Sequence, residues 1–101
     1  MTFADTLKTL PDYTGHEIVL TDANGQRVAS ILNAPGTSGS FRVYAYLAQK
    51  FGAISPHAAT EGLEIFAEHT LDARAHPGKH PNIDRLLAIV ASGIALSAHI
   101  P

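Results

Sequence analysis

The stretch His16–Leu32 has the sequence HEIVLTDANGQRVASIL and contains the clearest local signal in the chain. Two short runs rich in apolar and β-branched residues, Glu17–Thr21 and Arg27–Leu32, flank the dipeptide Asn24-Gly25. That dipeptide favours the positive φ angles of a type I′ turn, so the pattern predicts a β-hairpin. Because two strands alone are not stable in water, helices must cover one face of this hairpin.

Helical patterns surround the hairpin on both sides. Thr2 and Asp5 have the spacing of a capping-box pair at the start of a first helix that Pro11 ends. Three further helices are expected after the loop 33–40, and a serine cap precedes the first two of them. The predicted helices are Thr2–Leu10, Phe41–Phe51 after Ser40, Ser55 to about Ala75, and about Asn82 to Ser97. The order α-β-β-α-α-α predicts an α+β fold, in which an N-terminal helix and a β-hairpin are followed by three helices packed on it.

Length and composition exclude several classes of protein. A chain of 101 residues with 46% hydrophobic residues and a formal net charge of −2 fits a single globular domain over residues 1–101. Seven basic against nine acidic residues offer no positive surface for a phosphate backbone, so no nucleic acid is expected as a partner. The longest apolar run, Leu86–Ala98, is too short for a membrane span. With no cysteine and no secretory signal pattern, a cytoplasmic location is expected.

Two stretches of the sequence are similar to a known family. The first is Asn33–Ile54, in which a Gly-Ser loop enters Arg42-Val43-Tyr44, and the second is Glu68–Leu86, which contains Pro77-Gly78-Lys79-His80-Pro81. With these stretches the chain resembles a small proteobacterial family of unknown function over nearly its whole length, Ala91–Pro101 excepted. The resemblance implies a compact bacterial α+β fold and carries no activity.

Three of the six histidines fall within twelve residues and form the first candidate site. If the third helix continues through Ala75, His69, Asp72 and His76 project from one face, and His80 closes over them from the following loop. Such ligands suit zinc, nickel, manganese or ferrous iron, so a divalent-metal site is one interpretation of this cluster, although no cofactor is assigned. The alternatives are a polar ligand-binding corner and ordinary hydrogen bonding at a helix end. Supporting polar residues are Glu68, Lys79, Asn82, Asp84 and Arg85.

The Gly-Ser loop before the second helix is the other candidate site. Free backbone amides at a helix N-terminus bind anions, and Arg42 would add positive charge. The anion candidates are Gly36, Ser38, Gly39, Ser40 and Arg42. The alternative is a helix that the Ser40 side chain caps, with no ligand.

The last predicted helix is apolar nearly all round. A single small domain offers one layer to cover such a helix, so its remaining face is expected to meet a second copy of the chain. The predicted interface residues are Leu87, Val90 and Ile94.

Together these features predict a small cytoplasmic α+β protein that acts as a non-catalytic, homodimeric binding or accessory module. Its polar corner, His69–Arg85, would take a small anionic ligand or a protein partner. The competing hypothesis is a metal-dependent, hydrolase-like enzyme that uses His69, Asp72, His76 and His80.

Overall fold

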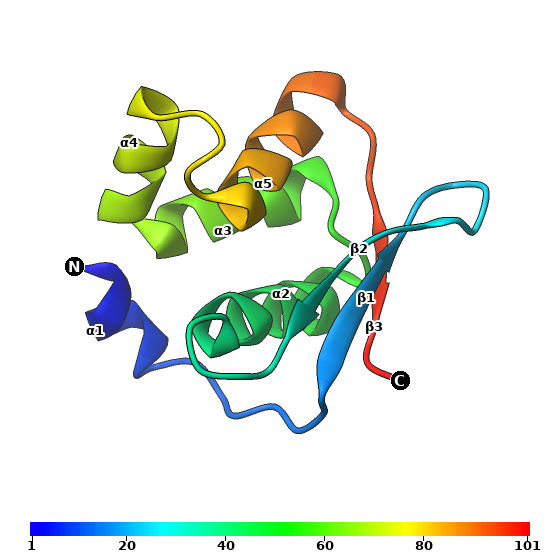
Figure 1. Cartoon of the computed structure of the whole chain (residues 1–101), viewed down its shortest axis with the longest axis horizontal. Coiled ribbons are helices and arrows are strands. Elements are labelled where there is room, and N and C mark those ends of the chain that lie inside the picture. Colours follow the sequence, from blue (N-terminus) through cyan, green and yellow to red (C-terminus); the bar gives the residue numbers. More distant parts are fainter.

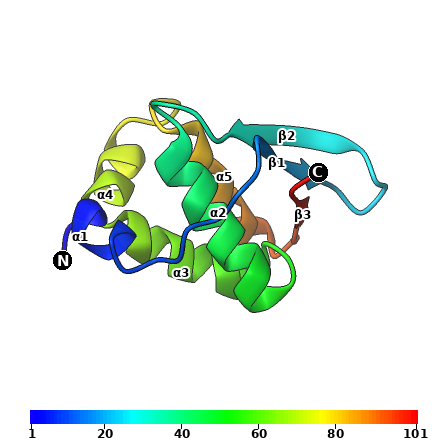
Figure 2. The ribbon, with the colours of Figure 1, turned by 90° about the horizontal axis from the view of Figure 1, so that it is seen from below.

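The computed structural model describes residues 1–101 and places a small antiparallel sheet beside five helices (Figure 1). Helix α2 lies between the sheet and the other helices, and it contacts all three strands (Figure 1, Figure 2). The strand order β2-β1-β3 shows that a C-terminal strand extends the hairpin. The elements in chain order are α1 (Phe3–Leu7), β1 (Glu17–Thr21), β2 (Arg27–Leu32), α2 (Ser38–Phe51), α3 (Pro56–Phe66), α4 (Glu68–Ala75), α5 (Pro81–Ser92) and β3 (Ser97–His99). The predicted α+β class is confirmed, with one helix and one strand more than predicted.

The hairpin forms where predicted, but its turn is not of type I′. The carbonyl of Asp22 accepts a hydrogen bond from the N–H of Gly25 (3.0 Å), and Gly25 is the one turn residue with a positive φ, 79°. This geometry is a type I turn followed by a left-handed glycine. The Asp22 carboxylate also accepts hydrogen bonds from the N–H groups of Asn24 (2.9 Å) and Gln26 (3.0 Å). These bonds support a longer loop in which Asn24 keeps a negative φ.

The core lies between α2, the sheet and the other long helices. Strand β1 contributes Ile18 and Leu20, and α2 contributes Phe41, Tyr44 and Leu47; each is at most 1% exposed. Burying a large side chain stabilises the fold by roughly 1.5–3 kcal/mol, so these residues carry much of the stability of an alanine-rich chain. Tyr44 and Leu47, three positions apart, lie on the buried face of α2.

The long helix predicted from Ser55 to Ala75 is two helices. Ser55 caps α3 as predicted, because its hydroxyl oxygen accepts a hydrogen bond from the N–H of Ala58 (3.1 Å). The helix ends at Ala67, whose φ of 50° and ψ of −112° are not helical. The buried Thr70 hydroxyl donates to the carbonyl of Leu63 (2.7 Å) and so satisfies a group at the end of α3. The break therefore separates His69 and Asp72, on α4, from α3.

The prediction of a last helix from about Asn82 to Ser97 is also wrong, because α5 ends at Ser92. Gly93 follows with a φ of 73°, the left-handed conformation that commonly terminates a helix. The chain then returns to the sheet, where β3 pairs antiparallel with β1 and Leu96 forms a β-bridge with Ile54. Part of the apolar surface assigned to a helix therefore covers the sheet and core. None of the helices has the length and apolar character needed to cross a membrane.

Candidate functional site

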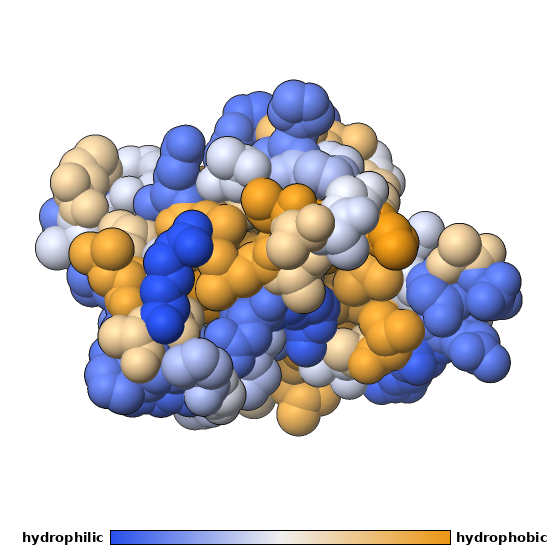
Figure 3. All heavy atoms as spheres, turned by 90° about the horizontal axis from the view of Figure 1, so that it is seen from above, coloured by the Kyte–Doolittle hydropathy of each residue, from blue (hydrophilic) through white to orange (hydrophobic).

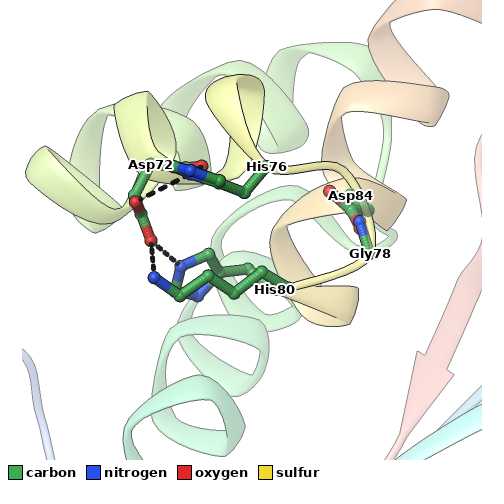
Figure 4. A network of polar contacts seen from close by, with 6 residues as sticks. Asp72, His76, Gly78, His80 and Asp84 are labelled. Atoms are coloured by element: carbon green, nitrogen blue, oxygen red, sulfur yellow. Dashed lines mark hydrogen bonds and ion pairs between the residues drawn. The ribbon is translucent and has the colours of Figure 1, made fainter.

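Asp72 is the centre of a polar network between the end of α4 and the start of α5 (Figure 4). Its Oδ2 atom accepts hydrogen bonds from Lys79 Nζ (2.8 Å) and His80 Nε2 (2.7 Å), and its Oδ1 atom lies 3.2 Å from His76 Nδ1. Hydrogen bonds from Lys79 and His80 lower the pKa of Asp72 well below its ordinary value. Asp72 is therefore a carboxylate that fixes the connection 76–80 against α4.

His69 is close to this network but does not bond to Asp72. Its ring lies edge-on to the ring of Phe3, with 5.4 Å between centroids, and 5.8 Å from the ring of His80. Nowhere in the chain are three or more histidine, aspartate or glutamate side chains arranged to hold a metal ion. His69 therefore lies near the network in spite of the break at Ala67. Its ring packs against the rings of Phe3 and His80 and does not join His76 at the Asp72 carboxylate.

Two of the supporting acidic residues have structural partners. Glu68 accepts a hydrogen bond from the N–H of Phe3 (2.7 Å), which lowers the pKa of Glu68 and ties α1 to α4. Asp84 accepts one from the N–H of Gly78 (2.9 Å) and lies in the first turn of α5, where a negative charge is favourable (Figure 4). The contact between His76 Nδ1 and the carbonyl of Asp72 (3.3 Å) is likewise ordinary helix-end chemistry.

Asn82 and Arg85 brace the start of α5 against α2. Arg85 donates to Asn82 Oδ1 (3.0 Å) and to the hydroxyl of Tyr44 (3.3 Å), and that hydroxyl donates to the Asn82 carbonyl. Burial raises the pKa of Tyr44 to about 12, so the hydroxyl keeps its proton. This network fixes the first turn of α5 relative to the core.

The structure joins the two predicted sites in a single cleft of about 390 Å³. Gly36, Thr37 and Ser40 come from the Gly-Ser loop and the first turn of α2, and they face residues from the histidine corner. The remaining lining residues are Phe3, Phe66, His69, Lys79, His80, Pro81, Asn82 and Ile83. Nothing in the sequence indicates that the two sites meet, because forty positions separate Ser40 from His80.

Both helices that begin at the cleft lack a side-chain cap. The Thr37 hydroxyl donates to the carbonyl of Leu32 (2.6 Å), and Ser40 is not the predicted cap because the helix already begins at Ser38. As a result, the N–H groups of Ser40 and Asn82 have no hydrogen-bond partner within the chain. Two such donors beside one cleft favour a negatively charged ligand.

Arg42 does not add its charge to this cleft, contrary to expectation. Its guanidinium donates to the carbonyl of Leu7 (3.1 Å) and forms an ion pair with Asp12. With Ser38 and Gly39 it lines a different depression, beside the link between α1 and β1. The positive side chain at the cleft is Lys79, one of the predicted supporting residues.

Residues 3–100 match the family described as Uncharacterized protein conserved in bacteria (DUF2322). The chain belongs to this family. The match confirms the resemblance to a bacterial family of unknown function, and it includes the C-terminal residues that the resemblance left out. The DUF2322 chain matches no curated protein and no solved structure.

Proposed function

We propose that the protein is a non-catalytic cytoplasmic binding module whose cleft takes a small anionic ligand bearing a carboxylate or phosphate group. The observation that carries this proposal is the meeting of two uncapped helix starts, α2 and α5, beside the ammonium group of Lys79. Helix N-termini and a lysine are both favourable surroundings for a negative charge.

Donors for an anion come from several elements. The ammonium of Lys79 has three N–H donors, of which Asp72 takes one. His69 and His80 line the same cleft and offer ring nitrogens, while Ser40 and Asn82 offer backbone N–H groups. Asp72 is not a lining residue. Its contacts with Lys79 and His80 hold these two lining residues in position.

The volume and lining of the cleft favour a small ligand with an apolar part. About 390 Å³ lies within the range of small-molecule sites. Phe3, Phe66 and Ile83 form the apolar portion of the lining, and the polar groups gather around the two helix starts. This division fits a compact molecule with one anionic end better than a bare inorganic ion.

The metal-dependent, hydrolase-like alternative has no comparable support. The Asp72 carboxylate already accepts bonds from Lys79 and His80, and a cationic lysine beside a carboxylate opposes a divalent cation. The geometry thus favours binding of an anion over binding of a metal.

Calorimetric titration with inorganic phosphate and with benzoate, an anion with an apolar ring, tests this proposal. Saturable binding of at least one of them is expected. Lys79→Ala should weaken it by about tenfold, the loss of one charge-assisted hydrogen bond. Lys8→Ala is the matched control, since Lys8 is an exposed lysine that does not line the cleft. If neither anion binds, or if Lys79→Ala binds as tightly as Lys8→Ala, the proposal is wrong.

A further inference from the structure

Helices α3, α4 and α5 line an open apolar groove that shares no lining residue with the cleft. Two adjoining depressions of about 750 and 570 Å³ share Leu63, Arg74 and Val90 in their linings, so they form one continuous groove. Leu71 and Val90, which line it, are 71% and 43% exposed. Figure 3 shows apolar residues gathered over the α4 and α5 side of the molecule, and one strongly hydrophilic side chain lies across this apolar surface.

The groove follows from the break at Ala67. Because α4 begins with a new direction, it buries Thr70 and Ala73 against the rest of the chain and leaves Leu71 in solvent. An exposed leucine beside a half-exposed valine and a half-buried leucine, Leu63, is a larger apolar surface than single scattered residues make.

Two opposite charges that have no partner in the chain line the same groove. Arg74 lines both depressions and Glu64 lines one of them, and neither forms an ion pair with any residue of the chain. The third charged lining residue, Asp84, already accepts the N–H of Gly78. The groove therefore holds one positive and one negative side chain without any partner, and the hydrogen-bonded Asp84 carboxylate, around an apolar centre.

We propose that a second copy of the chain occupies this groove in a two-fold symmetric dimer. In such an interface residue i of one copy contacts residue j of the other and the reverse contact repeats. The pairing that we propose is Arg74 of each copy with Glu64 of the other, because these opposite charges line the same groove. Leucine and valine side chains then meet near the axis, with the charges around them, as in protein interfaces generally. The surface is thus complementary to itself, which favours a second copy over a different protein.

The proposal keeps part of the predicted interface and changes the rest. Leu87 and Val90 line the groove, whereas Ile94 lies beyond α5, 64% exposed, and is not a lining residue. No residue of the anion cleft lines the groove, so the proposed dimer and the proposed anion site use different surfaces.

Sedimentation over a range of concentrations tests the dimer, and a charge exchange tests its geometry. Arg74→Glu and Glu64→Arg should each raise the dissociation constant by about tenfold, because each places like charges together. The double variant should return to within about threefold of the wild type. Leu71→Ser should weaken the dimer by about tenfold or more, whereas Val28→Ser, at an exposed valine on β2, should leave it unchanged.

Circular dichroism of each variant shows whether it remains folded. A wild-type protein that stays monomeric at millimolar concentration overturns the proposal. So does a dimer that Leu71→Ser leaves intact, since that dimer uses another surface. If the two single charge variants weaken the dimer and the double variant fails to restore it, the proposed pairing of Arg74 with Glu64 is wrong.

Discussion

Replacing Ala67 by glycine should make the protein more stable. Ala67 has φ 50° and ψ −112° between α3 and α4, and it is the one non-glycine residue with a positive φ. An L-residue held in a sparsely populated region costs about 1–3 kcal/mol. Glycine adopts this conformation without that strain but loses about 0.5–1 kcal/mol through the greater freedom of the unfolded chain. The balance is a gain of about 1 kcal/mol for Ala67→Gly.

Urea denaturation measures this gain directly. The midpoint should rise while the slope stays constant, because the surface exposed on unfolding is nearly unchanged. In a thermal scan, about 1 kcal/mol corresponds to a rise of roughly 4–8 °C for a domain of this size.

Ala88→Gly is the matched control for this substitution. Ala88 is exposed in the interior of α5, where glycine should cost about 1 kcal/mol. The two alanine-to-glycine changes are therefore expected to have opposite signs. Destabilisation of equal size at both positions would contradict a strained, non-helical Ala67, because it would place Ala67 inside a continuous helix.

Three further substitutions test the packing and the electrostatics. Gly62→Ala should cost about 1 kcal/mol in urea denaturation, since a Cβ atom there would lie 2.8 Å from Leu86 Cδ1 and 2.9 Å from Leu47 Cδ1, both fully buried. Tyr44→Phe should cost about 1 kcal/mol because it removes a buried hydrogen bond. The pKa of Tyr44 is about 12 in the folded chain and 10.0 ordinarily, so the protonated hydroxyl stabilises the wild type fully below pH 10 and progressively less between pH 10 and pH 12. The Tyr44→Phe variant should lack this decrease in stability. Asp72→Asn should be less stable than the wild type at neutral pH, and the difference should shrink as the pH falls below 3.8 towards the lowered pKa of Asp72. Equal pH profiles for wild type and variant would contradict either of the last two predictions.

Local signals in the sequence predict much of the fold. The strands on either side of Asn24-Gly25 form the expected hairpin, and the predicted capping box is present, with Thr2 Oγ1 and the Asp5 carboxylate each accepting from the other's N–H. Such features depend on residues only a few positions apart, so a single sequence contains what decides them.

The errors lie where distant contacts override local preference. Alanine is a strong helix former, and nothing near Ala67 indicates a break; the buried Thr70 side chain and its bond to Leu63 become favourable only after folding. For the last helix, which ends at Ser92 and not at Ser97, the sequence does contain a signal for the end. Gly93 is a possible helix stop, and Leu96, Ala98 and Ile100 alternate as in a strand.

The candidate site was predictable in its parts but not in its assembly. The histidine corner and the Gly-Ser loop stand out by composition, yet only the folded chain brings Asn82 near Ser40, where hydrogen bonds join Tyr44 of α2 to Asn82 and Arg85 of α5. The direction of Arg42 could not be foreseen either, because its partner Asp12 lies thirty positions earlier.

An amide-resolved NMR titration with inorganic phosphate and benzoate tests anion binding at the cleft most directly. The backbone N–H signals of Ser40 and Asn82 should shift together and saturate, with one dissociation constant. The N–H of Gly25, which bonds to Asp22 in the hairpin turn, should not move. Saturable shifts elsewhere that leave Ser40 and Asn82 unchanged, or no saturable shift with either anion, would show that the cleft is not an anion site.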